Sequence, residues 1–225
     1  MTQPIVVSLG EILWDMLPEG KRAGGAPVNF TYHASHNGSI GRSISAVGND
    51  SLGDELVAAV KNAGIDAIIQ RNDFPTGTVG VVLNDGIPTY EIVEGVAWDH
   101  IALTDELIDV VAQADAVCFG SLACREEESR NTLLELLKHT KPSALKYYDI
   151  NIRADYFSQE LIEEQLKAAT VFKINDDELE LLRPMFNVEG SDEEACAWFI
   201  KNYDLDYMIL TGGSRFSIIM HKDGE

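Results

Sequence analysis

Short apolar runs alternate with segments of helical length along most of this 225-residue chain. Residues 5–9 form an apolar run that stops at Gly10, residues 27–36 begin at a proline, and residues 43–47 are mostly apolar again. A short apolar run bounded by turn residues is typical of a buried strand, and proline favours the first turn of a helix. This alternation predicts an α/β fold with a mainly parallel sheet flanked by helices.

The alternation continues towards the end of the chain. Further strands are predicted at 116–119, 146–150, 171–174, 207–210 and 216–220. Further helices are predicted at 51–62, 126–139, 160–168, 177–183 and 192–203. We therefore expect residues 1–225 to form one α/β domain, which ends on a turn without a final covering helix.

One segment departs from the alternation. Residues 78–83 and 89–93 are rich in β-prone side chains, and the turn sequence Asn84-Asp85-Gly86 separates them. This pattern predicts a β-hairpin, which could extend the edge of the main sheet or stand apart as a flap. We assign residues 76–97, with part of 12–22, to a small β-lid inserted into the domain.

The charge balance limits the kinds of partner. The chain has 17 Lys and Arg against 37 Asp and Glu, a formal net charge of −20, and no basic run. Nucleic acids and anionic membranes are bound through clusters of Lys and Arg, so we expect neither as a partner. The three cysteines have no C-x-x-C spacing, and no signal peptide is recognisable. Both features predict a cytoplasmic protein with reduced thiols.

Polar residues follow several predicted strands. Asp15 lies shortly after the first strand, and Arg153 follows the strand at 146–150. Ligands of open α/β sheets bind at the carboxyl ends of the strands. A carboxylate there can accept hydrogen bonds from the hydroxyls of a polyol, and a guanidinium can bind an anion through two hydrogen bonds. Solvated turns and surface ion pairs are the structural alternatives.

Two turns at helix starts could also bind ligands. The Gly24-Gly25 pair precedes the helix that carries Asn29, and glycines allow the backbone to approach a ligand closely. Residues 175–178 open another helix, where acidic side chains either complement the helix dipole or hold the water shell of Mg²⁺. His33 and His36 share a helix face but lack a third metal ligand nearby.

Taken in order, these motifs resemble the PfkB (ribokinase-like) family of carbohydrate kinases, and most of all its fructokinases. The similar segments near the amino terminus are Gly10-Glu11 with Asp15, Ala23-Gly24-Gly25-Ala26-Pro27-x-Asn29 and Val47-Gly48-Asn49-Asp50. The later ones are Pro75-Thr76-Gly77, Ala97-Trp98-Asp99, Asp149-x-Asn151-x-Arg153, Asn175-x-x-Glu178 and Thr211-Gly212-Gly213. The resemblance covers essentially the whole chain.

The resemblance implies an ATP-dependent kinase that transfers the γ-phosphoryl group to a primary hydroxyl of a sugar. Fructose is the first candidate, and ketodeoxygluconate and ribose are the alternatives. It implies that sugar is bound by Asp15, Gly24, Gly25, Asn29 and Tyr90. It further implies that Arg153 faces the transferred phosphoryl, that Glu178 serves Mg²⁺ through water, and that the nucleotide is bound by Asn175, Thr211 and Gly213.

The chain also departs from the family pattern. Residues 1–225 contain no D-T-x-G-A-G-D segment, which in the family supplies the catalytic base, so we expect an incomplete kinase domain that is inactive alone. A non-catalytic sugar-binding remnant is therefore the alternative class. Phe216 stands where the family tends to have glycine, and Arg71, Arg125 and Arg130 leave an acidic or phosphorylated substrate open. Because isolated hairpins are marginally stable, we expect a homodimer through the lid.

Overall fold

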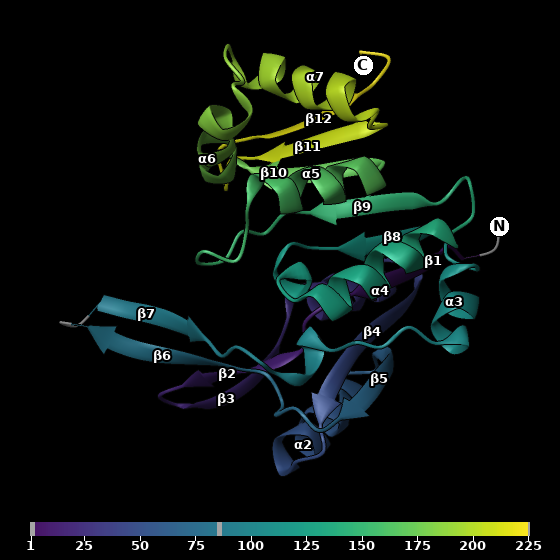
Figure 1. Ribbon diagram of the computed structural model, residues 1–225, viewed down its shortest axis with the longest axis vertical. Helices are drawn as coiled ribbons and strands as arrows, with labels where there is room; N and C mark the ends of the chain where they lie inside the picture. Colours follow the sequence, from purple (N-terminus) through teal and green to yellow (C-terminus); the bar gives the residue numbers. More distant parts are fainter. Residues whose placement is uncertain (1–2, 85–86, 225) are drawn as a thin grey trace.

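The computed structural model describes residues 3–84 and 87–224, without the side chains of 81–90. Its main sheet has eight strands (Figure 1). In spatial order they are β12 (Ser217–His221), β11 (Tyr207–Thr211), β10 (Val171–Asn175), β9 (Leu145–Asp149), β8 (Ala116–Phe119), β1 (Ile5–Leu9), β4 (Ile40–Gly48) and β5 (Asp66–Asn72). Among these strands only β12 runs antiparallel to its neighbour. The predicted mainly parallel sheet is confirmed.

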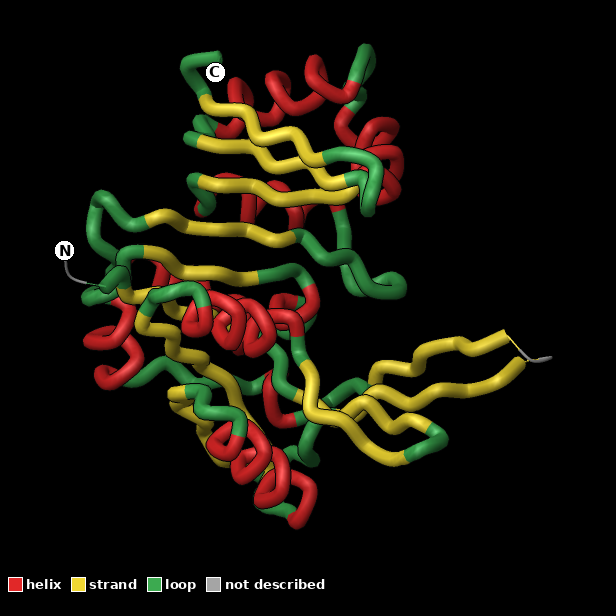
Figure 2. The backbone as a smooth tube through the Cα atoms, turned by 180° about the vertical axis from the view of Figure 1, so that it is seen from behind, coloured by secondary structure: helices red, strands yellow, loops and turns green. Residues whose placement is uncertain are grey.

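Seven α-helices connect the strands of the described chain and cover the main sheet (Figure 2). They are α1 (Ala26–His36), α2 (Ser51–Asn62), α3 (Asp105–Val111), α4 (Glu127–Lys138), α5 (Gln159–Ala168), α6 (Asp176–Phe186) and α7 (Asp192–Tyr203). Strand β5 and helix α3 were not predicted from the sequence. Every residue of β5 keeps some exposure, so its side chains do not form the apolar run that marks a central strand.

Two apolar cores lie on opposite faces of the main sheet. Ile44 and Ala46 of β4 belong to the larger core, which also receives buried side chains from α3 to α7. Val47, one residue further on, belongs to the smaller core beside α1 and α2. Successive side chains of a strand point to opposite faces, so β4 supplies both cores. Within the described chain, no helix has the length and apolar character needed to cross a membrane.

The hairpin stands apart from the main sheet. Its strands β6 (Thr78–Asn84) and β7 (Ile87–Ile92) join β2 (Leu13–Leu17) and β3 (Gly20–Gly24) in a second sheet of four strands, ordered β3-β2-β6-β7. In Figure 1 this second sheet, called the small sheet below, projects from the body of the domain. The alternative that the hairpin extends the edge of the main sheet is therefore wrong.

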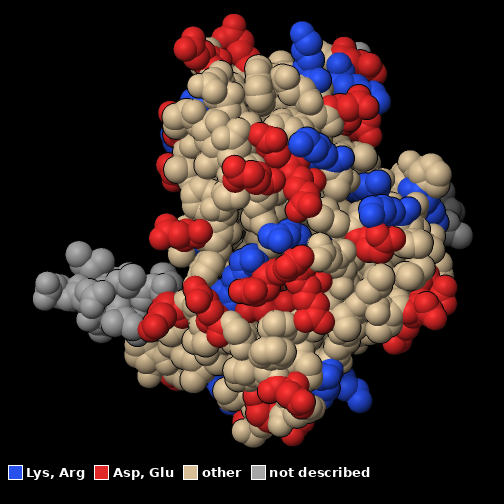
Figure 3. Space-filling model, in the orientation of Figure 1, with Lys and Arg blue, Asp and Glu red and all other residues tan. Residues whose placement is uncertain are grey.

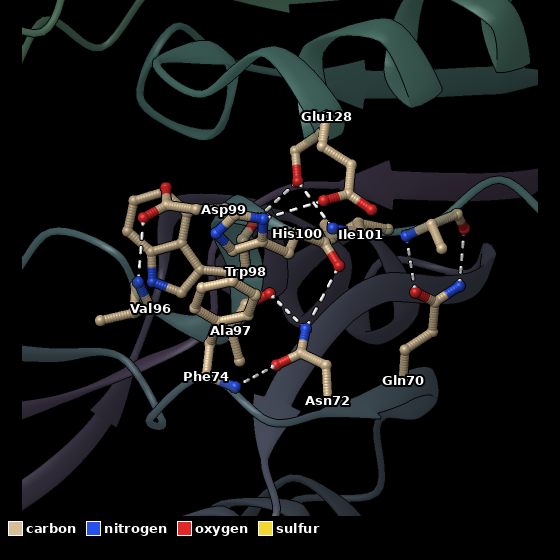
Figure 4. A network of polar contacts seen from close by, with 12 residues as sticks. Gln70, Asn72, Phe74, Val96, Ala97, Trp98, Asp99, His100, Ile101 and Glu128 are labelled. Carbon is tan, nitrogen blue, oxygen red and sulfur yellow. Dashed lines mark hydrogen bonds and ion pairs between the residues drawn. The ribbon is translucent and has the colours of Figure 1, made fainter.

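Hydrogen bonds fix the chain where it leaves and re-enters the main domain. On the outgoing side, Oδ2 of Asp50 accepts the Thr76 N–H at 2.9 Å, and Oδ1 accepts the Thr76 hydroxyl at 2.7 Å. On the returning side, Asn72 donates to the carbonyl of Ala97 at 2.9 Å, and His100 lies 2.8 Å from Glu128 (Figure 4). The small sheet is thus held at its root by side chains of the main domain.

Charged side chains of both signs are intermixed on the face drawn in Figure 3. Several of the few cations form short ion pairs, for example Arg42 with Asp66 at 2.7 Å and Lys141 with Asp115 at 2.8 Å. The excess of acidic residues is therefore spread over a surface where much of the positive charge already has a partner.

Candidate active site

A cleft of about 470 Å³ lies between the small sheet and the carboxyl ends of β1 and β9. We call it the acceptor cleft. It is lined by Glu11, Leu13, Asp15, Gly25, Ala26, Asn29, Val79, Ile92, Leu122, Asn151 and Arg153. Four of the residues singled out in the sequence, Asp15, Gly25, Asn29 and Arg153, thus come together from distant segments.

The glycine turn fits tightly against the strand before it. Gly25 has φ of +125° and precedes α1, and a side chain on it would collide with the carbonyl oxygen of Glu11. A Cβ on Gly24 would lie 2.6 Å from Oδ2 of Asp15. Both glycines therefore make room for the carboxylate-bearing segment, and Gly25 additionally needs a backbone conformation that other residues avoid.

Asp15 lies on β2, opposite Arg22 of β3. Its side chain is half-buried and lines the acceptor cleft. Partial burial raises the pKa of the Asp15 carboxyl, and the positive charge of Arg22 opposes this rise. A carboxylate in this position can accept hydrogen bonds from two neighbouring hydroxyls.

Glu11 was not selected as a site residue from the sequence, although it also lines the acceptor cleft. It is only 4% exposed, and its Oε1 accepts the N–H of Ala26, at the start of α1, at 3.0 Å. Burial raises the pKa of the Glu11 carboxyl from 4.5 to about 7, while hydrogen bonds from backbone N–H groups and the charge of Arg153 act against the rise. Its place directly after Gly10 was the one available signal.

The loop after β9 carries Asn151 and Arg153. Asn151 has φ of +42°, and the guanidinium of Arg153 is exposed, with one N–H donated to the carbonyl of Ile152 at 3.0 Å. Glu178 holds this loop, because its Oε1 accepts the Ile152 N–H at 2.9 Å and its Oε2 accepts the Asn175 N–H at 2.9 Å. Glu178 therefore joins the acceptor cleft to the start of α6.

A second cleft, of about 570 Å³, lies at the carboxyl ends of β10 and β11. We call it the donor cleft. It is lined by Lys173, Asn175, Asp176, Asp177, Thr211, Gly212, Gly213, Ser214 and Arg215. Asn175, Thr211 and Gly213, which the resemblance implied for the nucleotide, thus lie together. Gly213 has φ of +60°, and Arg215 pairs with Asp176.

The residue that departs from the family pattern lies beside this cleft. The carbonyl of Phe216 accepts the Gly212 N–H at 3.0 Å. A side chain on Gly212 would collide with the Phe216 ring. Gly212 therefore accommodates the ring, and the loop from Thr211 to Phe216 closes as a short turn between β11 and β12.

One ion pair links the two clefts. Nζ of Lys173, in the donor cleft, lies 2.9 Å from Oδ1 of Asp149. Asp149 shares with Glu11 and Asn151 a small cavity beside the acceptor cleft. The two clefts are thus linked at one edge of the main sheet by the Lys173–Asp149 pair and by the bonds from Glu178 to the backbones of Ile152 and Asn175.

The structure gives less support for a functional role at two other candidate positions, Tyr90 and His36. The backbone of Tyr90 pairs with Val81 in the small sheet, but the Tyr90 side chain lies outside the described part of the structure. His36 bonds through Nδ1 to the carbonyl of Tyr32 at 2.8 Å. The described residues contain no group of three or more His, Cys, Asp or Glu arranged to hold a metal ion.

Known proteins resemble this chain in sequence. The sequence model of the pfkB family of carbohydrate kinases matches residues 19–225. An uncharacterized sugar kinase of Pyrococcus horikoshii is 31% identical over 194 residues, which cover 78% of this chain and 63% of that protein. Fructokinase-1 of Zea mays is 28% identical over 207 residues, which cover 82% of this chain and 64% of that protein. The chain thus spans less than two thirds of the length of these relatives.

Solved structures share the fold. The Pyrococcus horikoshii sugar kinase in complex with ATP has a TM-score of 0.79 at 27% identity, with 96% of this chain and 74% of that chain covered. A fructokinase with bound ATP from Xylella fastidiosa has a TM-score of 0.83 at 19% identity, with 99% of this chain and 73% of that chain covered. With the family match over residues 19–225, these findings establish that the chain belongs to the PfkB family of carbohydrate kinases.

Proposed function

We propose that this protein is an ATP-dependent sugar kinase that transfers the γ-phosphoryl group to a primary hydroxyl, with fructose as the first candidate acceptor. One observation carries the proposal: the acceptor cleft, at the carboxyl end of β9, and the donor cleft, at the carboxyl ends of β10 and β11, lie at the same edge of the main sheet, where the Asp149–Lys173 ion pair joins β9 to β10. Phosphoryl transfer depends mainly on holding two substrates in line, which this arrangement supports.

In the acceptor cleft, the carboxylate of Asp15 and the amide of Asn29 bind sugar hydroxyls in this proposal. The Gly24-Gly25 turn brings backbone close to the sugar, and Tyr90 is the remaining sugar contact that the family resemblance implies. Arg153 has an exposed guanidinium at the cleft, so it can approach the phosphoryl group and stabilise its charge. Residues 1–225 contain no G-A-G-D motif, and we assign the catalytic base to none of them.

In the donor cleft, Asn175, Thr211 and Gly213 bind the nucleotide. Mg²⁺ in kinases is held by phosphates, waters and one or two carboxylates, and it screens the phosphate charge. Glu178 is buried and does not itself line the donor cleft, so in this proposal it reaches the ion only through water. Each Glu178 oxygen accepts one backbone N–H, so each keeps a lone pair that can accept a hydrogen bond from a water molecule.

We also propose that the protein is a homodimer in which two small sheets cover one another. The small sheet projects from the domain, and a projecting sheet needs a second layer to bury an apolar face (Figure 1). This pairing would also hold the sheet over the acceptor cleft, to which Val79 and Ile92 contribute.

The kinase proposal is tested by ADP formation from ATP and a panel of sugars, with the protein expressed from its complete reading frame. A rate that depends on one sugar supports the proposal. Calorimetric sugar binding without any sugar-dependent ADP formation would instead support the non-catalytic sugar-binding alternative.

A further inference from the structure

One of the three arginines that the sequence left unassigned is buried. Arg71 pairs with Asp54 at 2.8 Å and Arg130 lies 3.7 Å from Glu164, and these four side chains are all partly exposed. The Arg125 side chain is only 4% exposed. A charged side chain is seldom buried without a specific set of partners, so the partners of Arg125 indicate which parts of the chain it holds.

Arg125 binds the chain segment that follows the small sheet. Its Nε and Nη2 donate to the two carboxylate oxygens of Asp99, in the short helix η1 (Ala97–Asp99), at 2.8 and 2.7 Å. Nη2 also donates to the carbonyl of Val93, directly after β7, at 2.7 Å. Oδ2 of Asp99, which is fully buried, accepts the Val96 N–H at 3.1 Å (Figure 4). The guanidinium thus holds residues 93–99, called the returning arm below.

Tyr156 joins this region to the loop after β9. The Arg125 guanidinium lies 4.7 Å from the centre of the Tyr156 ring and 4.1 Å from the centre of the Trp98 ring, and such cation–π contacts are favourable. The Tyr156 hydroxyl donates to the carbonyl of Ile92, the last residue of β7, at 3.2 Å. The Tyr156 N–H donates to the Arg153 carbonyl at 3.2 Å. Tyr156 therefore contacts both the small sheet and the loop that carries Arg153.

These contacts lie directly behind the acceptor cleft. Ile92 and Arg153 both line that cleft, the first from the small sheet and the second from the loop after β9. Ile92 and Tyr156 pack against the same cluster of buried side chains, which includes Trp98. Burial raises the pKa of Tyr156, and a hydrogen bond with the Glu94 carboxylate raises it further, which places a group of the returning arm at the same hydroxyl. Because packed interiors transmit displacements, movement of the arm reaches the loop.

We propose that Arg125 and Tyr156 are positioning residues that couple the returning arm of the small sheet to the loop carrying Arg153. The small-sheet wall of the acceptor cleft and the guanidinium that faces the phosphoryl group are then set together. This inference rests on the proposed kinase function. Arg125 and Tyr156, both in the described part of the chain, do not line the acceptor cleft, so they act through Ile92 and Arg153. A misplacement of about 1 Å can cost on the order of a hundredfold in rate.

The kinetic test uses Tyr156→Phe in the protein from its complete reading frame. Phe keeps the ring beside Arg125 and removes the hydroxyl that bonds to Ile92. Tyr203→Phe, on α7 with its ring stacked on Phe199, is the matched control for loss of a tyrosine hydroxyl. Initial rates of ADP formation are measured with ATP and the fastest sugar of the panel varied, for each variant alone and combined with Arg153→Lys.

We expect Tyr156→Phe to lower kcat/KM for the sugar about fivefold, through both kcat and KM, and to leave the KM for ATP unchanged. Tyr203→Phe should match wild type. The loss of kcat should shrink below about twofold in Arg153→Lys, because lysine lacks the planar guanidinium that must be aligned. Equal losses in both backgrounds, or an equal rise in the KM for ATP, would overturn the inference while the kinase function stands. No sugar-dependent ADP formation in wild type would count against the kinase function itself.

Backbone hydrogen exchange tests the coupling without catalysis. Arg125→Lys removes the paired bonds to Asp99 and the flat contact with Tyr156. It should speed exchange at least about threefold in residues 151–156 as well as in the returning arm, while unchanged exchange in α7 shows that the variant is folded. Faster exchange confined to the returning arm would contradict the coupling.

Discussion

Glu11→Gln should change how stability depends on pH. The pKa of the Glu11 carboxyl rises from 4.5 to about 7 on folding because the group is buried. Such a rise corresponds to about 3 kcal/mol, at about 1.4 kcal/mol for each tenfold change in proton affinity. Gln is neutral at every pH and can still accept the Ala26 N–H, so the variant avoids the cost of ionising this group.

The difference in proton binding between the folded and unfolded states determines the direction in which stability changes with pH. Between about pH 4.5 and pH 7 the folded state keeps the Glu11 proton that the unfolded state has lost, so the free energy of unfolding falls as the pH rises. Relative to wild type, Glu11→Gln should therefore gain stability across this interval. The difference grows from near zero at its lower end to about 3 kcal/mol above pH 7.

Urea denaturation at several pH values from 4.5 to 8, followed by tryptophan fluorescence, measures this difference. Glu189→Gln, between α6 and α7, is the matched control, because it removes an equal charge from an exposed site and should show no comparable growth with pH. A difference between Glu11→Gln and wild type that stays constant over the interval would refute the claim that burial of this carboxyl sets its proton affinity.

Four further outcomes are expected. Asp15→Ala should raise the KM for sugar at least about tenfold with little change in the KM for ATP, measured by steady-state kinetics, since it removes charge-assisted hydrogen bonds. Glu178→Gln should lower kcat, raise the Mg²⁺ requirement and cost about 1–3 kcal/mol of stability in urea, because the Gln amide would face one of two backbone N–H donors. Gly25→Ala should destabilise the protein by more than about 1 kcal/mol in the same assay, because of its φ of +125°. A light-scattering mass should report a dimer, and a monomer at high concentration would contradict pairing of the small sheets.

Local sequence patterns were sufficient to predict the α/β fold. The apolar run at 5–9 and the acidic, capped start of α6 are features that neighbouring residues determine. Strand β5 was missed because its side chains are all partly exposed and show no period of two. The pairing of β2 with β6 depends on segments about 60 residues apart, which no local pattern encodes.

In the candidate site, too, local sequence patterns predicted some residues, and tertiary contacts determined the others. Asp15, Asn29 and Arg153 could be selected because each lies near the end of a predicted strand or the start of a predicted helix. Glu11 follows the first predicted strand as well, but it was not selected because the sequence does not show its burial against the Ala26 N–H, a contact made only by tertiary packing. Glu178 was expected at a metal, and the structure adds that it also holds the Ile152 and Asn175 backbones.

The central claim is that the acceptor and donor clefts form one kinase site, and initial-rate kinetics with both substrates varied tests it most directly. The protein from its complete reading frame should form ADP at a rate that saturates with ATP and with a sugar. In Asp15→Ala the saturation by sugar should weaken while the saturation by ATP stays unchanged. ADP formation that is equal with and without sugar would contradict the claim. An Asp15→Ala variant that loses saturation by ATP together with saturation by sugar would contradict it as well.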